Sequence, residues 1–125
     1  MAKRLPITIV ETPEFLSASR KLLTDEQRAD LVDYLARNPE QGDLIPESGG
    51  VRKLRWALEG RGKRGGARVI YFFHSQRLPV FLLTAYAKNQ RDNLSAPDLM
   101  GFRALTKSIA DTYAAQRKKP KGTLQ

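Results

Sequence analysis

The chain has 125 residues, of which 41% are hydrophobic and 28% charged, with a net charge of +9 and no cysteine. This composition suits one globular domain, and the lack of cysteine excludes disulfides, cysteine-ligated zinc and thiol catalysis. Apolar runs are only a few residues long and the N-terminus lacks a signal-peptide apolar region, so we expect a cytoplasmic protein outside the membrane.

The positive charge is concentrated in the middle of the chain. Residues 51–91 carry ten Lys/Arg and one acid, a net charge of +9, whereas residues 1–50 are net −3 and residues 92–125 net +3. Concentrated charge of one sign favours an acidic partner, of which nucleic acid is the first to consider. The alternative is a solvated basic face that serves solubility.

The first third of the chain predicts a strand and two helices. Residues 5–10 resemble a short strand. Thr12 is suited to cap a helix, and the proline after it suits the first helical position, which predicts a helix ending near Leu23. A T-x-x-Q capping box at residues 24–27 begins a second helix, which an Asn-Pro pair ends at Asn38. The side chains expected to face the core are Phe15, Leu16, Leu22, Leu23, Leu31, Val32 and Leu35.

The middle of the chain predicts a sheet. A loop over residues 39–50 is rich in glycine, proline and serine, and the hydrophobic pattern then changes to a period of two. The short connections that follow favour an antiparallel meander of three strands. These strands span residues 51–58, 67–73 and 79–87, with a basic, glycine-rich hairpin loop at 60–66 and a turn at 74–78.

An S-x-x-D capping box at residues 95–98 opens a C-terminal helix. Its apolar residues at helical spacing, expected in the core, are Leu99, Phe102, Leu105, Ile109 and Tyr113. We expect one domain over residues 1–115 and a flexible basic tail over residues 116–125. The fold class is therefore α+β: a small twisted antiparallel sheet with two N-terminal helices and one C-terminal helix, in the order β-α-α-β-β-β-α.

The alternation of side chains along a strand places several basic residues of the meander on one face of the sheet. Residues two apart in a strand share a face, so Lys53 and Arg55 lie together, and Tyr86 and Lys88 lie with Leu82 and Thr84. Phe81, Leu83 and Ala85 take the opposite face, which resembles core. Arg68 is bracketed by apolar neighbours and needs an anion or a carboxylate partner. The residues expected to line one side of the sheet are Lys53, Arg55, Arg68, Tyr86 and Lys88.

Further basic residues extend this side of the sheet into a phosphate-binding cleft. The hairpin loop would form its rim, and the expected RNA- or phosphate-binding residues are Arg52, Arg61, Lys63 and Arg64. The competing interpretation is that these side chains merely cover the sheet edge and prevent aggregation.

The residue types narrow the chemistry. The one histidine, His74, lies in a predicted turn, and no cluster of acids and histidine has metal-ligand spacing. No phosphate-binding P-loop and no Ser-His-Asp arrangement is present. Lysine, arginine and tyrosine can bind a phosphate and stabilise the charge that builds on it. RNA brings its own nucleophile, the 2′-hydroxyl, so such a site could cut RNA without a metal or a cofactor.

Three segments resemble the RelE/HigB branch of the bacterial toxins in the RelE/ParE superfamily. They are Gly49–Trp56, Gly62–Tyr71 and Leu82–Asn89, and the Leu94-Ser-Ala start of the last helix fits as well. The resemblance covers roughly residues 20–112. It implies a RelE-like fold and a ribosome-dependent endonuclease that cuts messenger RNA at the A-site codon. The 2′-hydroxyl attacks the adjacent phosphate, no metal is needed, and a cognate antitoxin protein holds the toxin inactive.

The resemblance also implies roles for single residues. Lys53 and Arg55 match the family's paired basic residues, one as general base or its orienter and the other stabilising the transition state. Arg68 matches the arginine that holds the scissile phosphate, and Lys88 the position of a further cation. Tyr86 would stack on a base or assist proton transfer.

The chain departs from the RelE pattern near the C-terminus, where Tyr113 lies at core spacing and no histidine of the HigB kind is present. Two alternatives remain. One is a ParE-like inhibitor of DNA gyrase with the same fold, against which the basic pair and Arg68 argue. The other is a non-catalytic RNA-binding module, whose affinity would fall with salt. For the antitoxin we expect a segment with acidic and apolar residues.

Overall fold

The computed structural model describes residues 5–58, 66–90 and 94–118. Its elements in chain order are β1 (Ile9–Glu11), α1 (Pro13–Arg20), α2 (Asp25–Arg37), β2 (Asp43–Leu44), β3 (Val51–Trp56), β4 (Ala67–Phe72), β5 (Val80–Ala87) and α3 (Ala96–Lys118). The α+β class and the predicted order of elements are confirmed. The short strand β2 is an addition within the predicted loop, and α3 continues through the first residues of the predicted tail.

One five-stranded sheet organises the chain, in the spatial order β1-β5-β4-β3-β2. β3, β4 and β5 form the predicted antiparallel meander. β1 pairs with β5 in parallel, Ile9 opposite Val80, so the sheet is mixed rather than wholly antiparallel. The parallel pair arises because the chain leaves β1 through two helices and the meander before its last strand returns beside it.

Helix caps fix where the helices begin. The Thr12 hydroxyl accepts a hydrogen bond from the Phe15 N–H at 3.2 Å and donates one to the Leu82 carbonyl at 2.8 Å, which joins the start of α1 to β5. Thr24 and Gln27 form the predicted capping box at the start of α2, with both reciprocal bonds present. α1 ends at Arg20, three residues earlier than predicted.

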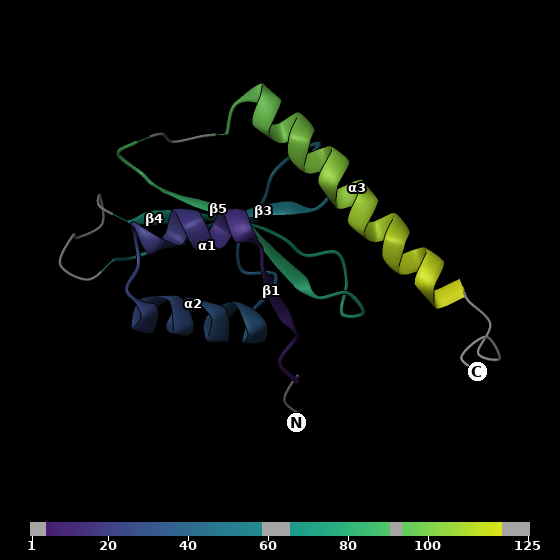
Figure 1. Ribbon diagram of the computed structural model, residues 1–125, viewed down its shortest axis with the longest axis horizontal. Helices are drawn as coiled ribbons and strands as arrows, with labels where there is room; N and C mark the ends of the chain where they lie inside the picture. Colours follow the sequence, from purple (N-terminus) through teal and green to yellow (C-terminus); the bar gives the residue numbers. More distant parts are fainter. Residues whose placement is uncertain (1–4, 59–65, 91–93, 119–125) are drawn as a thin grey trace.

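The two faces of the sheet are covered by different helices (Figure 1). α1 and α2 cover one face, which we call the two-helix face; its buried side chains include Phe15, Leu31, Leu35, Leu54, Val69 and Tyr71. α3 covers the other, the α3 face; its core includes Val51, Ile70, Phe72, Leu83 and Tyr86, with Phe102 and Ile109 against it. Leu105 was expected in the core but is 42% exposed. The next residue, Thr106, is buried instead, at 2% exposure.

No helix within the described ranges combines the length and the apolar character needed to cross a membrane.

Tyr71 fastens the loop that precedes β2. Its hydroxyl donates to the Pro39 carbonyl and accepts from the Gly42 N–H, both at 2.8 Å, and the residue is fully buried. Burial raises the pKa of Tyr71 above 10.0, because the phenolate would lose its hydration; the bond from Gly42 opposes this shift. The loop is therefore held from within the two-helix face.

Tyr71→Phe is expected to lower the free energy of unfolding by about 1–3 kcal/mol, because a buried carbonyl and a buried N–H lose their partner. The pH dependence has a definite sign. With the folded pKa raised, the contribution of Tyr71 is complete below pH 10.0 and is lost as the pH rises through the folded value. Urea titrations from pH 7 to 11 should show a shallower alkaline loss in the variant. An equal loss in both proteins would contradict this.

The junction of the loop before β3 with α3 needs a glycine. Gly49 has φ of +80°, a left-handed conformation, and a Cβ there would lie 2.9 Å from the Thr106 hydroxyl oxygen. Gly49→Ala is expected to cost about 1–2 kcal/mol of unfolding free energy. Gly101→Ala, inside α3 and with nothing within 4 Å of the added Cβ, should instead stabilise by about 0.5–1 kcal/mol. Thermal unfolding compares the two; shifts of the same sign would contradict the assignment.

Candidate functional site

Three adjacent strands bring two arginines and a tyrosine into one row on the α3 face. Arg55 of β3 lies opposite Arg68 of β4, and Arg68 lies opposite Tyr86 of β5. Lys53 lies two residues from Arg55 on the same strand and opposite Ile70. The parity of β3 and the register of the meander therefore bring these four side chains to one face. We call them the cation row.

Arg68 is the buried member of the cation row. It is only 6% exposed, whereas Arg55 is exposed to solvent. Its guanidinium donates one long hydrogen bond of 3.4 Å from Nη1 to the Ala67 carbonyl, and no described carboxylate forms an ion pair with it. A buried charge without a counter-charge is costly. The location therefore fits an anion that approaches from outside the chain.

Lys88 lies one residue past the end of β5. Its backbone N–H donates to the Gly66 carbonyl at 3.1 Å. Gly66 directly precedes β4 and is two residues from Arg68, so this bond holds Lys88 beside the start of β4. Its side chain is half-buried. The backbone thus places Lys88 at the same end of the sheet as Arg68 and Tyr86.

A bulge changes which residues of β5 accompany Tyr86. The pairing of β4 with β5 shifts between Ile70 and Tyr71, so that Thr84 lies opposite Ile70 and Leu82 lies opposite Tyr71. Leu82 therefore packs on the two-helix face, whereas Phe81 and Leu83 pack with Tyr86 on the α3 face. The predicted faces of these three side chains were wrong, because simple alternation does not hold across a bulge.

Arg52 does not join the cation row. Its Nη1 donates to the Glu40 carbonyl at 3.1 Å and to the Gly42 carbonyl at 2.9 Å, and its guanidinium lies 6.0 Å from the centre of the Phe73 ring. It points to the opposite face from Lys53 and holds the same loop as Tyr71. These contacts give Arg52 a structural role, and an RNA contact by this residue stays a prediction. Arg61, Lys63 and Arg64 lie outside the described residues.

A pocket opens at the sheet edge beside Lys53 and Arg55. We call it the edge pocket; it measures about 260 Å³ and is lined by Tyr34, Gln41, Asp43, Lys53, Leu54 and Arg55. The sequence did not indicate Tyr34, Gln41 or Asp43. Tyr34 is three residues after the buried Leu31, a spacing that predicts a core position. The only signal for the other two was their place in a polar loop before a strand.

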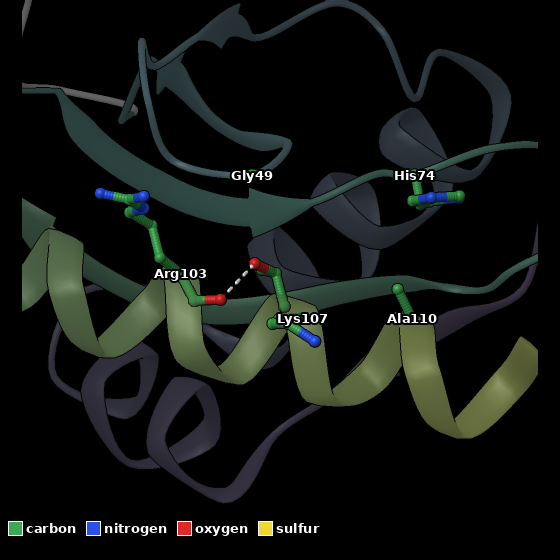
Figure 2. A pocket seen from close by; sticks show the side chains of 6 residues that line it. Gly49, His74, Arg103, Lys107 and Ala110 are labelled. Carbon is green, nitrogen blue, oxygen red and sulfur yellow. Dashed lines mark hydrogen bonds between the residues drawn. The ribbon is translucent and has the colours of Figure 1, made fainter.

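A larger cavity of about 400 Å³ lies between α3 and the ends of β3 and β4, lined by Gly49, His74, Arg103, Thr106, Lys107 and Ala110 (Figure 2). The Thr106 hydroxyl donates to the Arg103 carbonyl at 3.1 Å, and the exposed Lys107 ammonium pairs with Asp111 at 2.7 Å. His74 follows β4 at the end opposite Arg68, roughly 20 Å away for six extended residues. This cavity is therefore separate from the cation row.

The described residues contain no group of three or more His, Asp or Glu side chains placed to hold a metal ion. The side chains that the cation row offers are ammonium, guanidinium and phenol groups. These bind anions and exchange protons.

Comparison with known proteins gives a family. The family model described as RelE toxin of the RelE/RelB toxin–antitoxin system matches residues 8–123, a range that includes every helix and strand described above. Among solved structures, a mutant of the E. coli toxin RelE in the free state is similar, with a TM-score of 0.49 and 18% sequence identity. The alignment covers 65% of this chain and 82% of that one.

Proposed function

Since the chain belongs to the RelE toxin family and is the toxin of a toxin–antitoxin pair, we propose that it is an endoribonuclease that cuts messenger RNA in the ribosomal A site. The single observation that carries the proposal is the cation row, and within it the buried Arg68, which pairs with none of the described carboxylates. A phosphate is the anion that such a site would receive from RNA.

The proposed reaction needs two proton transfers and no water. The 2′-oxygen of one nucleotide attacks the adjacent phosphorus as its hydroxyl proton leaves. The bond from phosphorus to the 5′-oxygen breaks, and that oxygen gains a proton. The products are a 2′,3′-cyclic phosphate and a 5′-hydroxyl end, so atoms and charge balance without a metal or a redox partner.

The side chains divide between these tasks by their chemistry. A guanidinium keeps its proton, so Arg55 and Arg68 bind the non-bridging phosphate oxygens and stabilise the charge that develops on them. Lys53, Tyr86 and Lys88 carry groups that can exchange a proton. Arg55 is exposed and Arg68 buried. The phosphate would therefore enter past Arg55 and rest against Arg68.

The family implies an antitoxin partner, and we extend the list of partners to the ribosome and messenger RNA. An antitoxin segment with acidic side chains would compensate the cation row, and apolar side chains would cover exposed residues such as Leu44 and Met100, which are 56% and 69% exposed. Both the acidic and the apolar contacts would be lost when the toxin is released.

A single-atom substitution in the RNA tests the chemistry. A messenger bound to ribosomes is prepared with one 2′-deoxynucleotide at the mapped cut. Cleavage at that bond should disappear, while the all-ribose RNA yields a 2′,3′-cyclic phosphate. Continued cleavage at the deoxy position, or a 5′-phosphate end, would mean that water is the nucleophile and would contradict the proposal. Inhibition of DNA gyrase without any RNA product would support the ParE-like alternative.

A further inference from the structure

The edge pocket lies where β2 has ended and β3 continues without a neighbouring described strand on that side. β2 pairs with β3 only at Asp43 opposite Lys53 and Leu44 opposite Arg52. The Val51 carbonyl accepts from the Ile45 N–H at 2.9 Å, so alternate residues of β3 direct their backbone groups toward the β2 side. The N–H and C=O of Arg55 therefore point to an edge where no described strand follows. This edge offers one donor and one acceptor at fixed spacing.

The side chains around this edge add an aromatic ring and two polar groups. Tyr34 of α2 is half-buried, and its ring lies 5.4 Å from that of Trp56, tilted by 54°. Gln41 and Asp43 are exposed and line the same pocket, and Asp43 lies opposite Lys53 in the pairing of β2 with β3. Their amide and carboxylate therefore lie at the surface, where a ligand can reach them.

The chemistry of this lining indicates which part of RNA each side chain suits. Lys53 and Arg55 can bind a phosphate, whereas the Asp43 carboxylate can accept a hydrogen bond from the edge of a base. Single-stranded RNA is recognised when its bases stack on aromatic rings and hydrogen-bond through their edges. The volume of about 260 Å³ lies just below the ~300 Å³ lower limit for drug-sized ligands, so the pocket suits a single ring system.

We propose that the edge pocket binds one nucleobase of the RNA next to the scissile phosphate, and that it favours bases with an exocyclic amino group over uracil. This inference rests on the proposed function, because Lys53 and Arg55 line the pocket and also belong to the cation row. The base stacks on Tyr34, and its amino group donates to Asp43 or Gln41. The pocket then sets sequence preference, and the cation row acts on the phosphate.

Binding is measured without cleavage, using labelled 2′-O-methyl oligonucleotides of adenine, cytosine or uracil and fluorescence anisotropy at fixed salt. The wild type is expected to bind the adenine and cytosine oligonucleotides about tenfold more tightly than the uracil one. Asp43→Asn and Gln41→Ala should reduce this ratio. Tyr34→Ala should weaken binding of all three by about tenfold or more. Asp111→Asn, which removes the same charge on α3, should leave the ratio unchanged.

The binding results test the base pocket independently of whether the protein cuts RNA. Equal affinity for the three oligonucleotides, or a ratio that Asp43→Asn and Gln41→Ala leave intact, would overturn the base pocket even if the wild type cuts RNA on ribosomes. A base preference that these variants abolish would support the pocket even if no cleavage is found. In ribosome assays, the mapped cut sites of Asp43→Asn should include codons with uracil at the position that the wild type avoids.

Discussion

Arg68→Ala is expected to lower the rate of RNA cleavage by about 10²–10³ while the free energy of unfolding stays the same or rises. The loss follows because the guanidinium is the buried cation opposite Arg55 and Tyr86. The stability is retained because no described carboxylate is left without its partner, and a buried charge that none of the described carboxylates compensates disappears. A loss of activity without a loss of stability is typical of a residue kept for function rather than for folding.

Single-turnover cleavage on ribosomes and urea denaturation measure the two quantities. Arg77→Ala is the matched control, since it removes an arginine from the exposed turn before β5. It should change neither quantity by much. Full activity in Arg68→Ala would show that Arg68 does not act on the phosphate, and a large drop in stability would show that it is a structural residue.

Neighbouring substitutions on β3 should have opposite consequences. Lys53→Met removes a group that can exchange a proton, and cleavage should fall by about 10²–10⁴ with little change in stability. Arg52→Met removes two hydrogen bonds to the carbonyls of Glu40 and Gly42 and should cost about 2 kcal/mol of unfolding free energy. Cleavage per folded molecule should be kept in Arg52→Met.

The pair is informative because the two residues are adjacent in sequence and both are basic. General loss of positive charge would affect both variants alike in RNA binding. If Arg52→Met lowers cleavage as much as Lys53→Met at equal folded fraction, the separation of the two faces is wrong as an account of function.

The cation row could be predicted because β3 alternates regularly and the only charged side chains on the parity of Lys53 and Arg55 are basic. The role of Arg52 could not, because it depends on two carbonyls of the loop before β2 that only the folded chain brings near. In the sequence, a basic residue in a basic strand indicates RNA binding. In the folded chain, the guanidinium of Arg52 instead makes structural contacts with the loop before β2.

The sequence could not predict which side chains of β5 point to which face of the sheet, for a different reason. Nearly every residue of this strand is buried, because α1 and α3 cover its two sides, so the apolar pattern carries no parity. The bulge opposite Ile70 and Tyr71 then shifts the register without a glycine or proline to mark it. The edge pocket was missed because it depends on where β2 stops.

The most direct test compares one messenger RNA in two reactions with the purified toxin, free in solution and bound to ribosomes with a filled P site, with the new ends mapped by primer extension. The proposal predicts cuts on ribosomes only, within the A-site codon, with 5′-hydroxyl ends, and none with Arg68→Ala. Equal cleavage of the free RNA would contradict ribosome dependence. No cleavage in either reaction would contradict the nuclease itself.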